Sequence, residues 1–196
     1  MLINNQKVVL QKSLEDSCWL TAYLKTLTLR DTDVSTNKDY QKNFTSYYSV
    51  RRDEEWLKTF YSFMEQNKDN KDITFEEILR YPSSVPHKVN KKVSESQKGT
   101  TIEVSFSSKM LAPIDPSYPI WDSQVVKALG YKVDGSGVNK IELYIEAYRR
   151  LTEEIKSFIE TKEGMECIRL FDEIFPNHTH LSGFKKIDFY LWNIGK

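Results

Sequence analysis

Apolar residues recur every three or four positions along most of this 196-residue chain, and this spacing is the strongest constraint on its fold. In residues 5–29, for example, valines, leucines and aromatic residues fall roughly on one helical face. Alternation typical of a strand is confined to Thr101–Phe106, where it continues directly into a helical pattern. Only 7 residues are glycine and 6 are proline, which favours helices over a turn-rich sandwich. The sequence therefore predicts an all-α fold, a compact bundle of about eight helices.

Capping residues and polar segments predict where individual helices begin and end. The helical region 39–65 contains the polar segment 51–53, where it can divide into two helices. Thr74 and Glu77 have the spacing of a capping box, in which each side chain satisfies a backbone N–H group of the other residue. The helix that starts there is expected to stop at Pro82, because proline restricts the residue before it. Further helices are expected over residues 100–112, 122–130, 139–162, 164–175 and 184–194.

The chain is long enough for one domain, or for two small lobes that share a core. Residues 83–99 are rich in serine, lysine and valine and poor in large apolar residues, which is typical of a surface loop. The prediction is a single all-α domain, 1–196, that can divide at this loop into an N-terminal lobe, 1–82, and a catalytic lobe, 100–196.

The composition limits the classes of partner and compartment. The 28 basic and 28 acidic side chains cancel, so net charge gives no argument for nucleic-acid binding. The sequence has no signal-peptide core and no apolar run near the roughly 20 residues of a membrane span, so a cytoplasmic protein without membrane contact is expected. Cys18 and Cys167 lie in helical patterns, which indicates buried free thiols. His178 and His180 have no further ligand nearby, so no metal or other cofactor is expected.

The segment from Pro119 to Val126 carries the most specific chemical signal. An extended, proline-led stretch ends at Trp121 and Asp122, and an apolar helix begins at Ser123. Cleavage of an N-glycosidic bond builds positive charge on the sugar, and a fixed carboxylate such as that of Asp122 stabilises this charge and aligns a water. The helix start at Ser123 also offers backbone N–H groups to a DNA phosphate. The alternative is that Asp122 is only the N-cap of this helix.

Several aromatic residues can supply a pocket for a base that has been flipped out of a duplex. Trp19, Tyr48 and Trp121 are the candidates for contacts with the substrate, and Trp121 is favoured because it precedes Asp122. Most of the aromatic residues recur at helical spacing, so packing in the core is the alternative for each of them.

Two fragments, Ser105–Leu111 and Pro119–Val125, resemble the catalytic segment of the helix-hairpin-helix DNA glycosylase superfamily. In that family, a helix with a lysine or polar residue precedes a loop of the type Pro-hydrophobic-x-Asp and a second helix. The likeness is greatest to compact archaeal-type glycosylases of oxidised guanine, and Ile187–Trp192 is similar to the closing helix of small relatives. The resemblance implies a glycosylase-like two-lobed bundle, a catalytic Asp122 and DNA as the partner.

The chain also departs from the family pattern. It lacks the Leu-Pro-Gly-x-Gly hairpin with which the family grips a phosphate. When Ser107-Ser108 is aligned with the family's Ala-Ser pair, Ser105 occupies the position of the lysine nucleophile and is expected to contact the substrate. The resemblance therefore implies a monofunctional enzyme that leaves an abasic site. Lys109 is the rival amine, because it lies four residues later on the same helical face. Its alternative role is a solvated or phosphate-contacting lysine.

The resemblance extends to the substrate and the partners. It implies a small glycosylase of bacterial anti-phage defence, acting as a monomer on glucosylated hydroxymethylcytosine in duplex DNA. Arg51, Arg52, Lys91 and Lys92 are expected to contact phosphates, which give affinity without sequence preference. The alternative for these four cations is ordinary solvated charge. The competing function is a non-catalytic helical module that binds nucleic acid or another protein.

Overall fold

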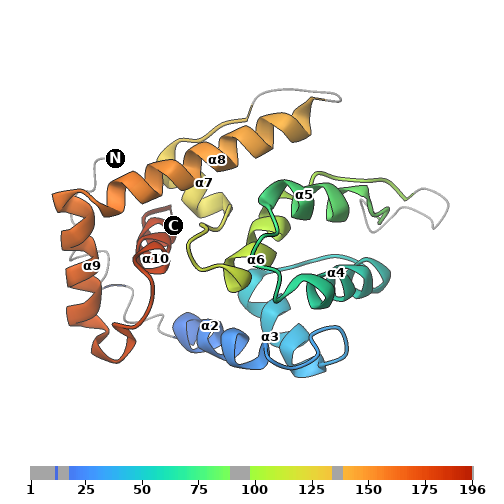
Figure 1. Cartoon of the computed structure of the whole chain (residues 1–196), viewed down its shortest axis with the longest axis horizontal. Helices are drawn as coiled ribbons and strands as arrows, with labels where there is room; N and C mark the ends of the chain where they lie inside the picture. Colours follow the sequence, from blue (N-terminus) through green and yellow to red (C-terminus); the bar gives the residue numbers. More distant parts are fainter. Residues whose placement is uncertain (1–11, 13–17, 89–97, 134–138, 196) are drawn as a thin grey trace. The chain divides into compact units, whose positions relative to one another are not determined.

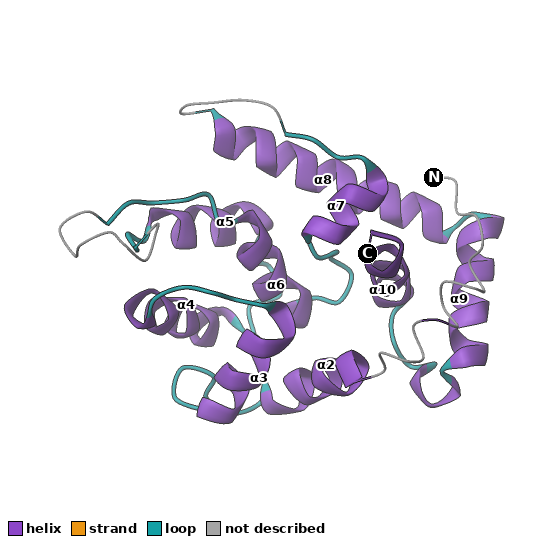
Figure 2. Cartoon of the chain, turned by 180° about the vertical axis from the view of Figure 1, so that it is seen from behind, coloured by secondary structure: helices purple, strands orange, loops and turns teal. Residues whose placement is uncertain are grey.

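The computed structural model describes residues 12, 18–88, 98–133 and 139–195. These residues form nine α-helices and one short 3₁₀ helix, η3 (Figure 1). Figure 2 shows helices and loops throughout the described chain, whose one β pairing is an isolated antiparallel bridge between His87 and Gly99. The all-α prediction is therefore confirmed.

The chain divides into two compact units. The first, residues 18–115, contains α2 (Cys18–Leu29), α3 (Lys38–Tyr48), α4 (Glu54–Asn67), α5 (Phe75–Ser84) and α6 (Val104–Ile114). The second, from Pro116 onward, contains α7 (Ser123–Leu129), α8 (Lys140–Ile159), α9 (Lys162–Ile174), η3 (Pro176–His178) and α10 (Gly183–Gly195).

The observed division of the chain differs from the expected one at residues 83–99. The helix that follows this segment, α6, packs against α5 inside the first unit. Glu103, which immediately precedes α6, also pairs with Arg52 at the start of α4. These contacts keep the chain on both sides of residues 83–99 in one unit, and the division falls between Asp115 and Pro116.

Local capping chemistry sets several helix ends as predicted. The expected break near residues 51–53 is confirmed, because α3 closes at Ser49 with a left-handed backbone (φ 53°) and α4 begins after its N-cap, Asp53. The capping box of Thr74 and Glu77 is confirmed at the start of α5. The alternating segment Thr101–Phe106 forms no strand, since α6 begins at Val104.

The predicted stop at Pro82 is wrong, because α5 continues through this proline to Ser84. Proline has no N–H, so the carbonyl of Ile78, four residues earlier, loses its helical partner. The hydroxyl of Ser107 in α6 approaches that carbonyl at 3.5 Å, and Pro82 is itself buried. Packing against α6 therefore offsets the local cost of a proline inside the helix.

Each unit has its own apolar core. In the first unit the core is mainly aromatic and includes Tyr40, Phe44, Tyr48, Trp56 and Phe60. In the second unit α10 packs against α7, α8 and α9, and both views show it between α7 and α9 (Figure 1, Figure 2). None of the described helices is both long and apolar enough to cross a membrane.

Cys167 belongs to the core of the second unit. Its thiol is free and its side chain is 2% exposed, and burial raises its pKa to about 12. The prediction of a buried free thiol is therefore confirmed for Cys167. The side chain of Cys18 lies outside the described part of the chain.

Candidate functional site

Asp122 is the N-cap of α7, as one of the two interpretations predicts. Its backbone is extended (φ −111°, ψ 152°), and its Oδ1 accepts the N–H of Gln124 at 2.9 Å. The carboxylate is half-buried, whereas Ser123 is exposed at the first position of this seven-residue helix. The capping bond fixes the orientation of the carboxylate. It is compatible with a further chemical role, because the cap uses only one of about four acceptor positions of a carboxylate.

Trp121 lies in an aromatic group of the second unit. The residue is 8% exposed, and the centre of its ring lies 5.9 Å from that of Tyr131 and 6.0 Å from that of Tyr144, both in T-shaped arrangements. Burial and the nearby carboxylate of Glu154 raise the pKa of Tyr131 to about 12. Trp121 therefore anchors the chain directly before Asp122, as its core alternative predicts.

Two buried side chains from other helices hold the extended stretch that leads to Asp122. The hydroxyl of Tyr148, in α8, donates to the carbonyl of Pro119 at 2.7 Å. The carboxylate of Asp188, in α10, accepts the N–H of Ile120 at 3.3 Å and pairs through its other oxygen with Lys185 Nζ at 3.1 Å. Sequence reasoning missed these three side chains, because nothing in the spacing of α8 or α10 distinguishes them.

Lys109 is buried inside the first unit and is not a solvated lysine. Its side chain runs to the end of α3, where Nζ donates to the carbonyl of Tyr48 at 2.9 Å. Cations are favoured at helix C-termini, where the last carbonyls lack helical partners. This contact gives Lys109 a structural role as the link between α6 and α3.

The other expected substrate-binding residues of the first unit lie on α2, α3 and α6. Tyr48 is buried and packs its ring at 4.6 Å from Phe44, in agreement with the core alternative. Trp19 is partly exposed on α2. Ser105 is partly exposed on the first turn of α6, where its carbonyl accepts the hydroxyl of Ser108 at 2.9 Å.

The two expected arginine contacts have different environments. Arg51 is exposed. Arg52 instead forms a bidentate ion pair with the buried carboxylate of Glu103, with its Nη2 2.8 Å from each carboxylate oxygen. Its guanidinium also lies 4.7 Å from the ring centre of Phe106. The phosphate contact expected of Arg52 therefore competes with a strong internal partner.

Glu103 joins Arg52 to a buried polar cluster that the sequence did not reveal. The hydroxyl of Thr101 donates to Glu103 Oε1 at 2.5 Å and lies 3.1 Å from Nε2 of His87. His87 and Glu103 are 1% and 4% exposed, so both depend on these partners for their hydrogen bonds. Burial was not predictable for His87, which the sequence placed in a loop.

The same cluster fixes both ends of the segment that carries Lys91 and Lys92. His87 and Gly99 exchange two backbone hydrogen bonds, of 2.9 and 3.0 Å. Next to them, Lys98 pairs with Glu55, and the N–H of Lys88 donates to Asp53 at 3.0 Å. Lys91 and Lys92 themselves lie outside the described residues.

No protein-family model matches the sequence, and no curated protein or solved structure matches it either. The assignment of a function therefore depends on the residues and contacts described above. Within the described stretches, no three His, Cys, Asp or Glu residues gather in a way that could hold a metal ion.

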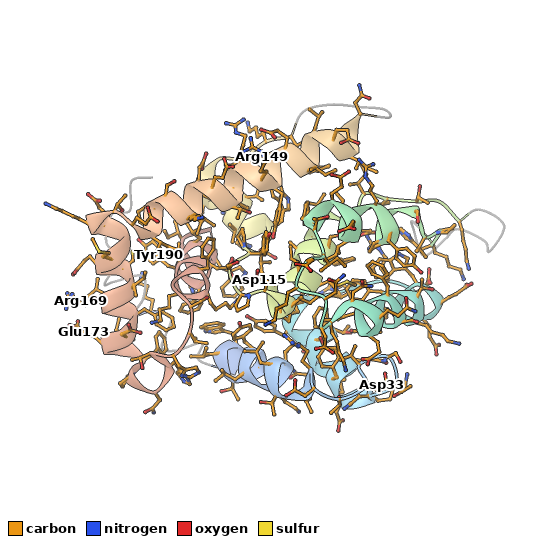
Figure 3. All side chains as sticks on the ribbon, viewed as in Figure 1. Asp33, Asp115, Arg149, Arg169, Glu173 and Tyr190 are labelled. Carbon is orange, nitrogen blue, oxygen red and sulfur yellow. The ribbon has the colours of Figure 1, made fainter. Side chains whose placement is uncertain are left out.

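Exposed charge on α8 and α9 is arranged in acidic triads. Arg149 binds Glu146 and Glu153, with the nearest atoms 2.7 and 2.5 Å apart, and Arg169 binds Glu166 and Glu173 in the same way on α9 (Figure 3). Hydrogen bonds from these arginines lower the pKa of Glu146 and Glu166. Each triad carries two carboxylates for one guanidinium, so Arg149 and Arg169 are poorly placed to bind DNA phosphates.

The expected site residues are shared between the two units. Asp122, Trp121 and Ser123 belong to the second unit; the first contains Ser105, Lys109, Tyr48, Trp19, Arg51 and Arg52. A surface hollow of about 510 Å³ in the first unit lies elsewhere, between α4 and α5, and is lined by residues that include Phe63, Asn67, Arg80 and Tyr81. None of the predicted site residues lines this hollow.

Proposed function

We propose that this protein is a monofunctional DNA N-glycosylase that flips out a modified base and removes it by hydrolysis. The observation that carries the proposal is the anchoring of Asp122. A half-buried carboxylate follows a buried tryptophan, on a stretch held by the side chains of Tyr148 and Asp188. A carboxylate that is oriented before the substrate arrives stabilises developing charge without the cost of reorganisation.

The proposed reaction places Asp122 beside the sugar of the flipped nucleotide. As the bond to the base breaks, positive charge develops on the sugar, and the negative charge of Asp122 stabilises it. The same carboxylate aligns a water that attacks the anomeric carbon; the hydroxyl group stays on the sugar, the proton goes to the departing base, and a free base and an abasic site result. The resemblance to helix-hairpin-helix glycosylases supports this role for Asp122. On the basis of the same resemblance, we extend the proposal to the substrate, which is glucosylated hydroxymethylcytosine in invading duplex DNA. The enzyme acts on it as a monomer in the cytoplasm.

The direct test is release of a base. Purified protein is incubated with genomic DNAs that carry different base modifications, among them glucosylated hydroxymethylcytosine, and the free bases are identified by mass spectrometry. We expect one modified base to be released and unmodified DNA to remain intact. DNA binding without release from any of these DNAs would instead support the non-catalytic module.

The absence of a covalent intermediate is a second expected result. Lys109, the rival nucleophile, is bound to the carbonyl of Tyr48, and Ser105 stands where the family has its lysine. Borohydride should therefore trap no protein–DNA adduct, and strands should break only after alkali or heat. A bifunctional glycosylase on its own substrate serves as the positive control. An adduct formed by this protein would contradict the hydrolytic mechanism, and mass spectrometry of the trapped peptide would identify the amine.

DNA affinity should depend on a few clustered cations, because the whole chain is neutral. Each phosphate neutralised contributes about −0.9 to the slope of log affinity against log salt. We expect a clearly negative slope, flattened by up to about two units in Lys91→Ala/Lys92→Ala. Arg149→Ala/Arg169→Ala is the matched control and should leave the slope unchanged, because both arginines sit in acidic triads. Equal slopes for the wild type and the lysine variant would remove this segment from the DNA interface.

A further inference from the structure

We infer that Asp188 is a positioning residue for Asp122, acts through the backbone of Ile120 and is supported by Lys185. The inference rests on the proposed function, because it assigns a reason for the geometry of the same carboxylate. Asp188 lies 66 positions after Asp122 in the chain, on a different helix.

Two hydrogen bonds at Ile120 connect the carboxylate of Asp188 to the backbone of Asp122. Asp188 Oδ1 accepts the N–H of Ile120 at 3.3 Å, and the carbonyl of Ile120 accepts the N–H of Asp122 at 3.0 Å. Both peptide groups of Ile120 are thus engaged, one by Asp188 and one by Asp122. A shift of Ile120 away from Asp188 therefore moves the backbone that carries the catalytic carboxylate.

The pairing with Lys185 keeps Asp188 in place. Lys185 Nζ lies 3.1 Å from Asp188 Oδ2, and the two side chains are each 8% exposed. A buried ion pair adds little stability compared with apolar residues of similar volume. Stability alone therefore does not explain two buried charges here, whereas a role in fixing the backbone at Ile120 does.

The far end of α10 holds α7 from the other side of Asp122. The carbonyl of Gly195 accepts Lys127 Nζ at 2.8 Å. Gly195 also lies so close to α7 that a Cβ atom there would be 2.1 Å from the carbonyl oxygen of Gln124. Thus α10 contacts the chain on both sides of Asp122, at Ile120 before it and at Gln124 and Lys127 after it. A displacement of about 1 Å in a reacting group can cost on the order of 100-fold in rate, so this anchoring is expected to matter for catalysis.

The test compares Lys185→Met/Asp188→Asn with Lys185→Met/Asp188→Leu. Both variants lack the buried charges and have side chains of similar size, but only asparagine keeps an oxygen that can accept the N–H of Ile120. With saturating DNA, single-turnover base release should be about 100-fold slower in the leucine variant than in the asparagine variant. The DNA concentration for half-maximal rate should be the same in both. Equal release rates in the two variants would overturn the inference.

A second ion pair of α10, between its buried Lys186 and the partly exposed Asp172 of α9, provides the control. Lys186 Nζ lies 2.6 Å from Asp172 and 2.9 Å from the carbonyl of Thr179, within the second unit. Lys186→Met/Asp172→Leu should therefore not slow release at saturating DNA. If it slows release as much as Lys185→Met/Asp188→Leu does, general loosening of α10 explains both results and the positioning role is wrong.

Amide hydrogen exchange separates this inference from the proposed function, because it needs no substrate. The N–H of Ile120 should exchange about ten times faster in the leucine variant than in the asparagine variant, as its partner oxygen is lost. If the wild type releases no base but this difference appears, the glycosylase proposal fails and the anchoring of Asp122 stands. If the exchange rates are equal, the inference fails whatever the activity. The protection of the other amide groups in the same exchange experiment shows whether the leucine variant is folded.

Discussion

Replacement of Asp122 by asparagine should remove base release and leave the fold intact. Asparagine is as good an N-cap as aspartate, so α7 and its bond to Gln124 are retained. The negative charge that we propose stabilises the sugar cation is lost, and we expect release to fall by at least about 100-fold, the scale seen when one preorganised electrostatic group is removed. Single-turnover kinetics, DNA affinity and thermal unfolding measured together check this result.

The control for this variant is a second aspartate that caps a helix. Asp53 caps α4 by accepting the N–H of Trp56 at 2.9 Å, in the unit that does not contain Asp122. Asp53 also accepts the N–H of Lys88 at 3.0 Å, a bond that asparagine cannot keep together with the cap. Asp53→Asn should still fold and, at saturating DNA, release the base at the wild-type rate. If Asp122→Asn is equally active, Asp122 is only a cap, and the competing interpretation as a binding module is favoured.

Loss of Arg52 should destabilise the first unit strongly. Arg52→Ala leaves the carboxylate of Glu103 buried, at 4% exposure, without its bidentate partner. Removal of one member of a buried pair costs about 3–5 kcal/mol, and we expect about 3 kcal/mol because a quarter of the Arg52 side chain is exposed. Urea unfolding at pH 7 measures the change.

The double variant Arg52→Met/Glu103→Leu identifies the physical cause. With both charges replaced by apolar groups, the penalty for an unpaired buried carboxylate disappears, so the double variant should be more stable than Arg52→Ala. Arg169→Ala is the exposed control and should cause no measurable change, because exposed ion pairs contribute little. If Arg52→Ala is as stable as the wild type, Glu103 is adequately stabilised by Thr101 and the pair is dispensable.

The helix boundaries that were predictable depend on contacts within a few residues. The capping box at Thr74, the cap at Asp122 and the break before Asp53 all involve side chains and backbone groups two or three positions apart. The predicted stop of α5 at Pro82 is wrong for the opposite reason. The packing that retains it in α5 comes from α6, and nothing near Pro82 in the sequence signals that neighbour.

Candidate site residues were predictable to the extent that their roles are local. The capping position of Asp122 follows from its immediate sequence. Lys109 binds a carbonyl 61 residues away, Arg52 binds a carboxylate 51 residues away, and Asp188 binds a backbone group 68 residues away. Each of these contacts requires the tertiary fold, so helical spacing alone could not separate a buried, paired charge from a solvated one.

The bridge between His87 and Gly99 also indicates where new residues can be inserted into the chain. Because these two residues are joined by paired hydrogen bonds next to the Lys98–Glu55 pair, the ends of the intervening stretch are fixed by contacts outside it. Closing a longer stretch between fixed ends costs only about 0.6 kcal/mol for each doubling of its length. We therefore expect that a fluorescent probe or another peptide can be inserted between these two residues while both helical units keep their cores.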